Sequence, residues 1–276
     1  MEILASGTIE QAASAILAGW RQSDLGSAPL PAGLRPKNVG DAYGIQQAVS
    51  RELGPVGGWR ICAAEPVARL AAAPLPLAMF QPEPALLAPS GTGTLRVLPA
   101  LALELGRSLP AYDAPFGEGE IIGAIGSTRP VALVLDPGGR QPASEAQPPD
   151  PLTAIAGSCG HSAVIYGRGV PGLPQVRSVA LSVTSIGPAR LIGRRRSTSE
   201  IGPVAIGDFI APLQWLANFG AGFPGGLMVT QGGLTVRQMV VMALTANAIP
   251  IAPGASIEIS FGELGKITLR IRRVKP

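Results

Sequence analysis

The sequence is poor in the residue types that most often carry catalysis and recognition. Of its 276 residues only 4% are aromatic and 14% are charged, and the formal net charge is +4. Without a strong basic excess or interleaved aromatic residues, the chain lacks the signature of a nucleic-acid-binding protein, so we expect no nucleic-acid partner. Proline interrupts the apolar stretches, and the N-terminus carries an acid where a secretion signal needs positive charge. We therefore expect no membrane partner.

Cysteine and histidine are scarce as well, with two and one in the whole chain. Cys62 and Cys159 lie far apart, and neither belongs to a Cys-x-x-Cys pair. The sequence therefore indicates neither a zinc site nor a disulfide framework. Free thiols are typical of a cytoplasmic protein, which is the location we expect.

What the sequence does contain is aliphatic residues and turn formers. Hydrophobic residues make up 46%, and 36 glycines and 28 prolines are spread along the chain. This composition favours short strands joined by turns over long helices, so we expect an α+β fold rich in β-strands.

Apolar periodicity divides the chain into a helical lead-in, residues 1–56, and a β-rich domain of the catalytic type, residues 57–276, which together form one structural unit. The lead-in holds two predicted helices, at residues 8–21 and 41–53, the second capped by Asp41. Two further helices are predicted at residues 118–125 and 206–218. Strands are predicted at residues 59–62, 95–105, 130–135, 162–166, 176–186, 239–244, 256–261 and 266–271.

Seven segments resemble, in the same order, motifs of the 2-keto-4-pentenoate hydratase and 4-oxalocrotonate decarboxylase branch of the fumarylacetoacetate hydrolase superfamily. They cover nearly the whole chain. They are DAYGIQ at residues 41–46, GWRI at 58–61, the stretch 95–110 that ends in GRSLP, PVALVLD at 130–136, WLAN at 215–218, ALT at 243–245 with PG at 253–254, and the FxxLGxI pattern at 261–267. The resemblance implies a mixed β-sheet roll or distorted barrel preceded by helices. It also implies a homodimer or a larger homo-oligomer.

The resemblance implies a divalent metal site that this sequence does not preserve. In the family, a Glu-x-Glu pair on one strand and a third Glu on a neighbouring strand hold the cation, which chelates the 2-oxo acid of the substrate. The register of the motifs places Leu98 and Ala100 at the pair and Leu133 at the third position. None of these has a side-chain oxygen, and Mg²⁺ or Mn²⁺ needs oxygen ligands. Moving Glu104 into the site would break the match at residues 106–110 and supply only one carboxylate.

We therefore expect no metal and no other cofactor, and we expect Leu98, Ala100 and Leu133 to line a greasy pocket for a small-molecule substrate. Trp59 and Thr245 lie in the matched motifs, and the resemblance also aligns AGSCGHS at residues 156–162 with the family's site-lining segment ADNASSG. Trp59, Ser162 and Thr245 are therefore further candidates for the pocket wall. Cys159 could act as a nucleophile beside His161, but a small buried residue of the pocket is the better interpretation.

Three polar residues are candidates for catalysis. Arg60 stands where the family has a lysine, and its guanidinium can hold a carboxylate or enolate oxygen but cannot transfer a proton. His161, the only side chain expected to titrate near neutrality, is a candidate general acid or base, the alternative being a structural histidine. Glu65 follows the Arg60 strand and either faces the cavity or lies on the surface.

Two functions stay open on this evidence, with a third as a weaker possibility. The first is a metal-independent enzyme of the lyase, isomerase or cyclase type, in secondary metabolism, that acts on an apolar polyene, a polyketide-like chain or an enolisable oxo substrate. The second is a non-catalytic relative that binds a ligand or supports a partner enzyme. A Mg²⁺-dependent 2-keto-4-pentenoate hydratase would need its ligands from elsewhere in the chain. Because the three replacements are uniformly apolar, the first function is favoured.

Overall fold

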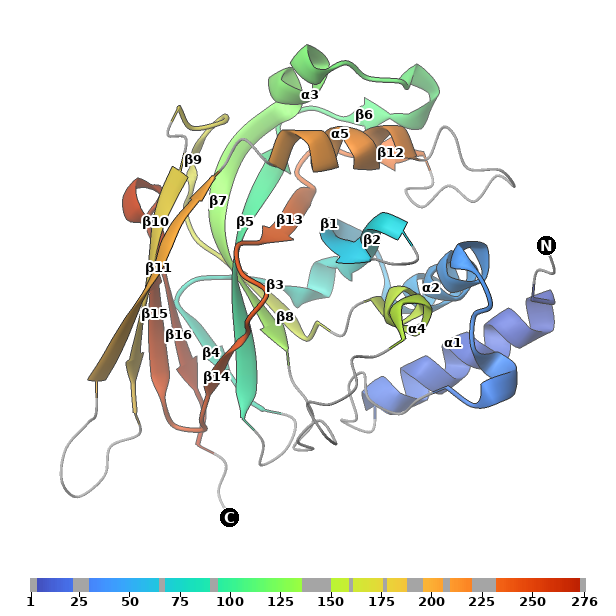
Figure 1. Cartoon of the computed structure of the whole chain (residues 1–276), viewed down its shortest axis with the longest axis horizontal. Coiled ribbons are helices and arrows are strands. Elements are labelled where there is room, and N and C mark those ends of the chain that lie inside the picture. Colours follow the sequence, from blue (N-terminus) through green and yellow to red (C-terminus); the bar gives the residue numbers. More distant parts are fainter. Residues whose placement is uncertain are drawn as a thin grey trace.

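The computed structural model describes residues 4–21, 30–64, 68–89, 94–135, 150–158, 161–175, 178–187, 196–205, 209–219 and 232–273. These residues form the predicted β-rich α+β fold (Figure 1). The two predicted N-terminal helices are present as α1 (Ser6–Arg21) and α2 (Val39–Leu53), which pack on each other. No helix among the described residues is both long and apolar enough to cross a membrane.

Helix α2 begins at Val39, two residues before its predicted cap. Asn38 is the N-cap, and its side chain accepts a hydrogen bond from the backbone N–H of Asp41. Asp41 is itself buried, and its carboxylate accepts from the backbone N–H groups of Leu4 and Lys37. The prediction of Asp41 as the cap was therefore wrong, because this carboxylate ties the preceding chain to the helix instead.

All eight predicted strands are present, and they belong to two sheets. In the larger sheet the strand order is β2 (Ala68–Pro76), β1 (Val56–Ala64), β13 (Met239–Ala243), β5 (Leu95–Leu105), β7 (Ile125–Leu135), β8 (Ala163–Tyr166) and β3 (Phe80–Pro82). Two short strands are added at its side: β14 (Ile249–Ile251) pairs with β5, and β9 (Val170–Pro171) pairs with β7.

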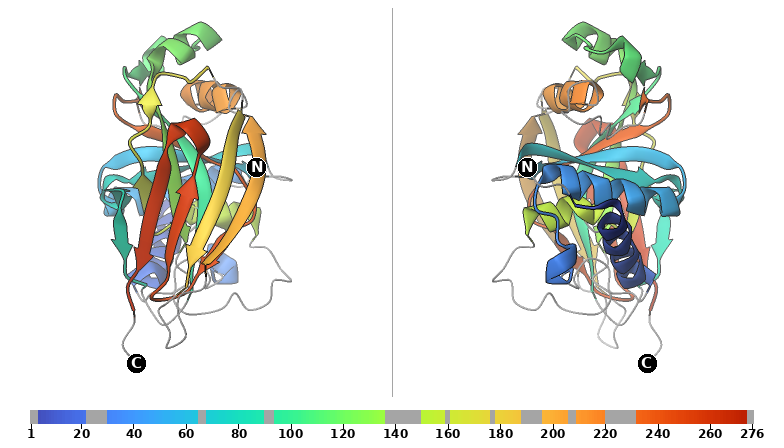
Figure 2. Two further views of the ribbon diagram at one scale, coloured as in Figure 1. Left: turned by 90° about the vertical axis from the view of Figure 1, so that its left-hand side faces the viewer. Right: turned by 90° about the vertical axis from the view of Figure 1, so that its right-hand side faces the viewer.

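The smaller sheet has the order β11 (Arg196–Ala205), β10 (Ser178–Ile186), β15 (Ser256–Ser260), β16 (Lys266–Ile271) and β4 (Ala85–Leu87). It stands on one side of the large sheet, and α1, α2 and the short helix α4 (Pro151–Ala156) stand on the other side of the molecule (Figure 2). A two-stranded ribbon of β6 (Leu109–Pro110) and β12 (Gly233–Leu234) lies near α3 (Glu118–Ala124) and α5 (Ile210–Phe219) (Figure 1).

The large sheet is curled, because its two ends are joined by a very short connection. Seven strands in a flat sheet would place β2 and β3 roughly 29 Å apart at about 4.8 Å per spacing, yet only the turn Leu77–Met79 links them, and that turn spans at most about 14 Å. Gly57 and Gly58 of β1 allow the approach: a Cβ on Gly57 would lie 2.8 Å from the Cα of Leu77, and one on Gly58 would lie 2.9 Å from the Phe80 ring. The sheet therefore closes into a roll.

Alternation along β5 separates two apolar clusters. The odd-numbered side chains, such as Val97, Leu101 and Leu103, belong to the main core that also holds residues of the smaller sheet and of α1 and α2. The even-numbered side chains point to the opposite face, as expected for a strand. They join a second cluster, here called the inner cluster, which consists of Leu75, Leu98, Ala100, Ala102, Val131, Leu133, Val164, Met239 and Val241.

Two matched motifs prove to be structural. In DAYGIQ, the Tyr43 hydroxyl accepts from the backbone N–H of Ala72, and the Gln46 amide donates to the carbonyl oxygens of Ala72 and of Ile155. The two side chains cover the free edge of β2 and hold α4 in place, which protects an edge that would otherwise be exposed. In WLAN, the Asn218 amide bonds both the N–H and the carbonyl oxygen of Phe116.

Candidate functional site

The positions that should hold the metal lie together inside the roll. Leu98 on β5 is directly opposite Leu133 on β7, and Ala100 is two residues further along the same face. All three belong to the inner cluster, with exposed fractions of 5% for Leu98 and 0% for Ala100 and Leu133. The strand register therefore brings the three residues to one place, as the motif alignment predicted.

These residues do not fit the divalent cation that the resemblance implies. A hard cation needs several oxygen ligands that converge on one point, and the side chains at this place end in methyl groups. In the part of the chain that the structure describes, no group of three His, Cys, Asp or Glu side chains is close enough to hold a metal ion.

Glu104, the alternative carboxylate on β5, has partners of its own. It lies on the same face as Ala102 by strand parity, and it accepts hydrogen bonds from the Ser127 hydroxyl at 2.6 Å and from Nε of Arg129 at 2.7 Å. Burial alone would raise the pKa of Glu104, but the bonds from Ser127 and Arg129 and the charge of Arg129 lower it below its usual value. Arg129 also lies over the Tyr166 ring, 5.8 Å from its centroid. This carboxylate is thus already neutralised by Arg129.

Arg60 and His161, far apart in the sequence, meet at the border of the inner cluster. Arg60 lies on β1, and its register neighbour on β13 is Val241, a member of that cluster. His161 precedes β8 and is 2% exposed. Nη1 of Arg60 is hydrogen-bonded to Nε2 of His161. The two polar candidates that the sequence singled out are therefore direct partners.

In this pair Arg60 carries the charge and His161 does not. Burial, and then the charge of Arg60, lower the pKa of His161 well below its ordinary value, so the imidazole is neutral at physiological pH. Among the described residues, the Arg60 guanidinium has His161 as its hydrogen-bond partner and makes no ion pair with a carboxylate. Nε of Arg60 and Nδ1 of His161 are both buried, and neither has a hydrogen-bond partner in the described part of the chain.

Ser158 was not singled out by the sequence, although it lies three residues before His161. It is 5% exposed, its buried hydroxyl has no hydrogen-bond partner among the residues that the structure describes, and its backbone has a positive φ of 50°. A non-glycine residue in this conformation is uncommon. The sequence offers one signal for Ser158, which is its place in residues 156–162, the segment that aligns with the family's site-lining motif.

The remaining predicted residues fall into three groups. Ser162 follows His161 and donates to the carbonyl oxygen of Val134, and Thr245 lies just after β13 with its hydroxyl accepting from the N–H of Asn247. Both are partly buried. Trp59 points away from Arg60, since neighbouring residues on a strand face opposite sides. Glu65 and Cys159 lie outside the described residues.

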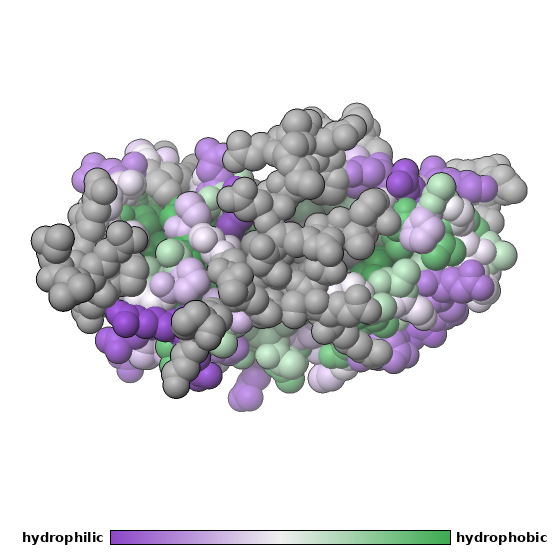
Figure 3. All heavy atoms as spheres, turned by 90° about the horizontal axis from the view of Figure 1, so that it is seen from below, coloured by the Kyte–Doolittle hydropathy of each residue, from purple (hydrophilic) through white to green (hydrophobic). Residues whose placement is uncertain are grey.

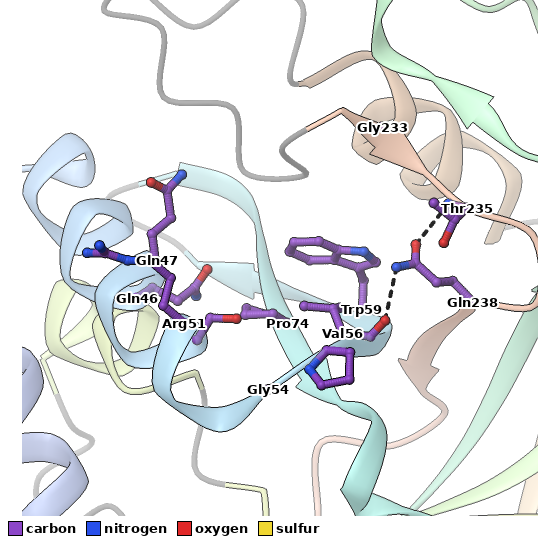
Figure 4. A pocket seen from close by; sticks show the side chains of 12 residues that line it. Gln46, Gln47, Arg51, Gly54, Val56, Trp59, Pro74, Gly233, Thr235 and Gln238 are labelled. Atoms are coloured by element: carbon purple, nitrogen blue, oxygen red, sulfur yellow. Dashed lines mark hydrogen bonds between the residues drawn. The ribbon is translucent and has the colours of Figure 1, made fainter.

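Trp59 lines a pocket on the outer side of β1. This pocket has a volume of about 310 Å³ and lies between α2 and the start of β13 (Figure 4). Its wall includes Gln46, Arg51, Pro74 and Gln238, and Gln238 bridges the N–H of Thr235 and the carbonyl oxygen of Val56. The structure therefore separates Trp59 from the Arg60 and His161 pair.

Taken together, the described residues on the inner face of the roll offer apolar side chains, the Glu104–Arg129 ion pair, the Arg60 guanidinium, which pairs with none of the described carboxylates, and one neutral imidazole. Such an arrangement can bind an anionic group of an otherwise apolar molecule and stabilise negative charge that develops on it. On the outer face that is seen from below, the coloured atoms form apolar patches among polar residues (Figure 3).

The backbone is similar to that of 4-oxalocrotonate decarboxylase from Pseudomonas putida G7, solved with magnesium and adipate. The TM-score is 0.71 over 98% of this chain and 100% of that chain, at 17% sequence identity. A second structure of that decarboxylase, with calcium and acetate, gives a TM-score of 0.69 at 16% identity, with the same shares of the two chains covered. The chain has the fumarylacetoacetate hydrolase-like fold.

More distant members of this fold match a smaller part of the chain. The 2-hydroxyhepta-2,4-diene-1,7-dioate isomerase from Mycobacterium marinum gives a TM-score of 0.53 at 14% identity, with 80% of this chain and 77% of that chain covered. No family model and no curated protein sequence matches the chain. At these identities the likeness shows a shared hydrolase-like fold and leaves the chemistry to be argued from the residues.

Proposed function

We propose that the chain is a metal-independent enzyme of the lyase, isomerase or cyclase type. Its substrate is an apolar polyene, a polyketide-like chain or an enolisable oxo compound that carries a carboxylate or develops an enolate. The apolar part is held by the inner cluster and its partly buried neighbours, and the anionic oxygen is held by Arg60. The fixed orientation of such a substrate lowers the activation barrier, because freezing out unproductive conformers in advance reduces the entropy lost at the transition state.

The observation that carries this proposal is that none of the described carboxylates pairs with the charge of Arg60. A partly buried guanidinium beside apolar side chains is costly unless an anion neutralises it, and among the described residues no carboxylate does so. An arginine side chain presents a planar fork of N–H donors that matches the two oxygens of a carboxylate. An anionic ligand group is the partner that this arrangement lacks.

The decarboxylase of the same fold supports the proposal in one respect. It was solved with adipate, a dicarboxylate with an apolar methylene chain, together with magnesium. In the present chain the cation has no ligands at Leu98, Ala100 and Leu133, so the positive charge that faces an anionic ligand comes from Arg60. We also propose a homo-oligomeric assembly, as in the family that the sequence resembles, and size-exclusion chromatography with light scattering will measure it.

Binding of a model ligand tests the role of Arg60. Sorbate, a small diene carboxylate, is the probe, and sorbyl alcohol is the control that lacks the charge. We expect calorimetry to show saturable binding of sorbate to the wild type and at least about tenfold weaker binding to Arg60→Met, since a charge-assisted hydrogen bond contributes about 1.5–3 kcal/mol. Sorbyl alcohol should bind weakly to both. Equal binding of sorbate by the two proteins would contradict the proposal.

One observation favours the non-catalytic alternative, in which the chain binds a ligand or supports a partner enzyme. Ala100 and Leu133 have no exposed surface, so the interior is closely packed where a substrate would replace the cation. Turnover separates the two functions. The wild type and Arg60→Met should be assayed with the products of neighbouring biosynthetic genes, with and without a chelator. Turnover that resists the chelator and disappears in the folded Arg60→Met variant supports the enzyme, whereas binding without turnover supports the alternative.

A further inference from the structure

The hydrogen bond between Arg60 and His161 fixes which nitrogen of the imidazole carries the proton. A guanidinium has five N–H donors and no acceptor. Because Nη1 of Arg60 donates to Nε2 of His161, Nε2 must present its lone pair. A neutral imidazole then carries its one proton on Nδ1.

The same contact removes the nitrogen that a general base would use. Nε2 is occupied by Arg60, and Nδ1 already holds a proton and has no acceptor among the described residues. Protonation of the ring would place a second positive charge beside Arg60 at a position that is 2% exposed. Burial, followed by the charge of Arg60, accordingly lowers the pKa of His161 well below its ordinary value.

We infer that His161 is a positioning residue: as a neutral Nδ1–H imidazole it accepts from Nη1 of Arg60 and thereby orients the remaining donors of the guanidinium toward the ligand anion. This role rests on the proposed function, and it replaces the acid–base role that the sequence suggested. The residues around it agree. Gln46 holds the end of α4 through the carbonyl oxygen of Ile155, and the N–H of Ser162, the residue next to His161, donates to the carbonyl oxygen of Val134.

The role restricts the chemistry of the proposed enzyme. Arginine is not deprotonated in proteins, and His161 has no free lone pair while it holds Arg60. This pair can therefore bind and polarise an oxyanion but does not accept a proton from the substrate. Reactions that need stabilisation of negative charge and a fixed substrate conformation are compatible with it.

The single histidine makes the arrangement directly measurable in the full-length protein. With ¹⁵N-labelled histidine and a tag free of histidine, a long-range ¹H–¹⁵N spectrum reports the proton on each ring nitrogen of His161 alone. We expect a protonated Nδ1 and an unprotonated Nε2, unchanged between about pH 8 and about pH 6. In Arg60→Met, Nε2 should become the protonated nitrogen, as in a free neutral imidazole. A wild-type spectrum with a protonated Nε2, or with both nitrogens protonated at neutral pH, would overturn the inference.

Two variants of His161 separate positioning from a merely structural role. The substitution His161→Gln keeps an acceptor for Arg60, whereas His161→Leu removes it. We expect sorbate to bind within about threefold of the wild type in His161→Gln and about tenfold more weakly in His161→Leu. Equal loss in both variants would contradict positioning. If the wild type itself does not bind sorbate, the proposed function fails, while the ring-nitrogen spectra still decide the geometry.

Discussion

His161 is the residue whose ionisation couples the stability of the fold to pH. In the folded chain, burial and the charge of Arg60 hold its pKa well below the ordinary value of 6.5. In the unfolded chain the imidazole takes up a proton near that ordinary value. Because the unfolded state then binds more protons than the folded state, this residue lowers the stability as the pH falls below about 6.5.

Replacement of His161 by glutamine should remove this part of the pH dependence. Between about pH 6.5 and about pH 5.5, the free energy of unfolding of the wild type should fall by about 1 kcal/mol more than that of His161→Gln. Urea unfolding at the two pH values measures the difference, and any other group that titrates in the same range affects both proteins alike. Parallel losses in the two proteins would show that His161 is charged, or exposed, in the folded state.

At the scale of elements, β1 has to approach β13 and β3 at the same time. A Cβ on Gly58 would overlap the backbone oxygen of Met239 and would lie 2.9 Å from the Phe80 ring. The backbone oxygen belongs to the strand ladder and cannot move without breaking it. The space for a Cβ at Gly58 is therefore taken by the backbone of β13 and by the Phe80 ring, whatever the backbone angles of the glycine.

A single methyl group tests this requirement. We expect Gly58→Ala to lower the free energy of unfolding by at least about 2 kcal/mol, because the β1–β13 ladder must open. Gly7→Ala in α1 is the matched control, since nothing lies within 4 Å of a Cβ there. It should be neutral or stabilise by up to about 1 kcal/mol. Thermal unfolding of the two variants gives the comparison, and a Gly58→Ala protein as stable as the control would contradict the described pairing.

Two long strands that the sequence did not predict, β2 and β11, share a physical reason. Strand β2 is mostly alanine and proline, residues of low strand propensity, and it exists because β1 pairs with one edge and Tyr43 and Gln46 of α2 cover the other. Strand β11 is largely polar, and its register partner is β10. Neither strand shows the alternation of apolar and polar residues that is typical of a strand. Both are formed by backbone pairing to a neighbour, which a local pattern does not record.

The candidate site was predictable to the extent that strand parity and the motif register define it. The placement of Leu98, Ala100 and Leu133 on one face follows from both. The contact of Arg60 with His161 follows from neither of them. It depends on where α4 and β8 place His161, which is 101 residues away from Arg60 in the chain. Trp59 and Arg60 share a motif, but they are consecutive residues of β1, so their side chains lie on different sides of the strand. A shared motif therefore did not mean a shared site.

For the whole molecule, the inner cluster contains the three positions at which the family resemblance implies metal-binding glutamates. We predict that the triple variant Leu98→Glu, Ala100→Glu and Leu133→Glu loses thermal stability strongly without metal, since three buried carboxylates repel one another. Millimolar Mn²⁺ or Mg²⁺ should raise its melting temperature. The corresponding triple glutamine variant has side chains of similar size without charge and should not respond to the metal.

The wild type should likewise be indifferent to the metal and to a chelator in the same thermal scan. A rise in the melting temperature of the wild type with Mg²⁺ would mean that oxygen ligands from elsewhere in the chain hold a cation. If the triple glutamate variant cannot be purified folded, refolding from urea in the presence and absence of Mn²⁺ gives the same comparison.

The turn Leu77–Met79 connects the two strands that stand at the ends of the large sheet. The strands at its two ends, β2 and β3, are held together by the covalent chain, and in the described sheet order they are not neighbours in a ladder. Separating any two neighbouring strands of the sheet would break a row of backbone hydrogen bonds between them. Widening the roll between β2 and β3 would therefore break no strand ladder of the described sheet, although the length of the turn limits how far these two strands can separate.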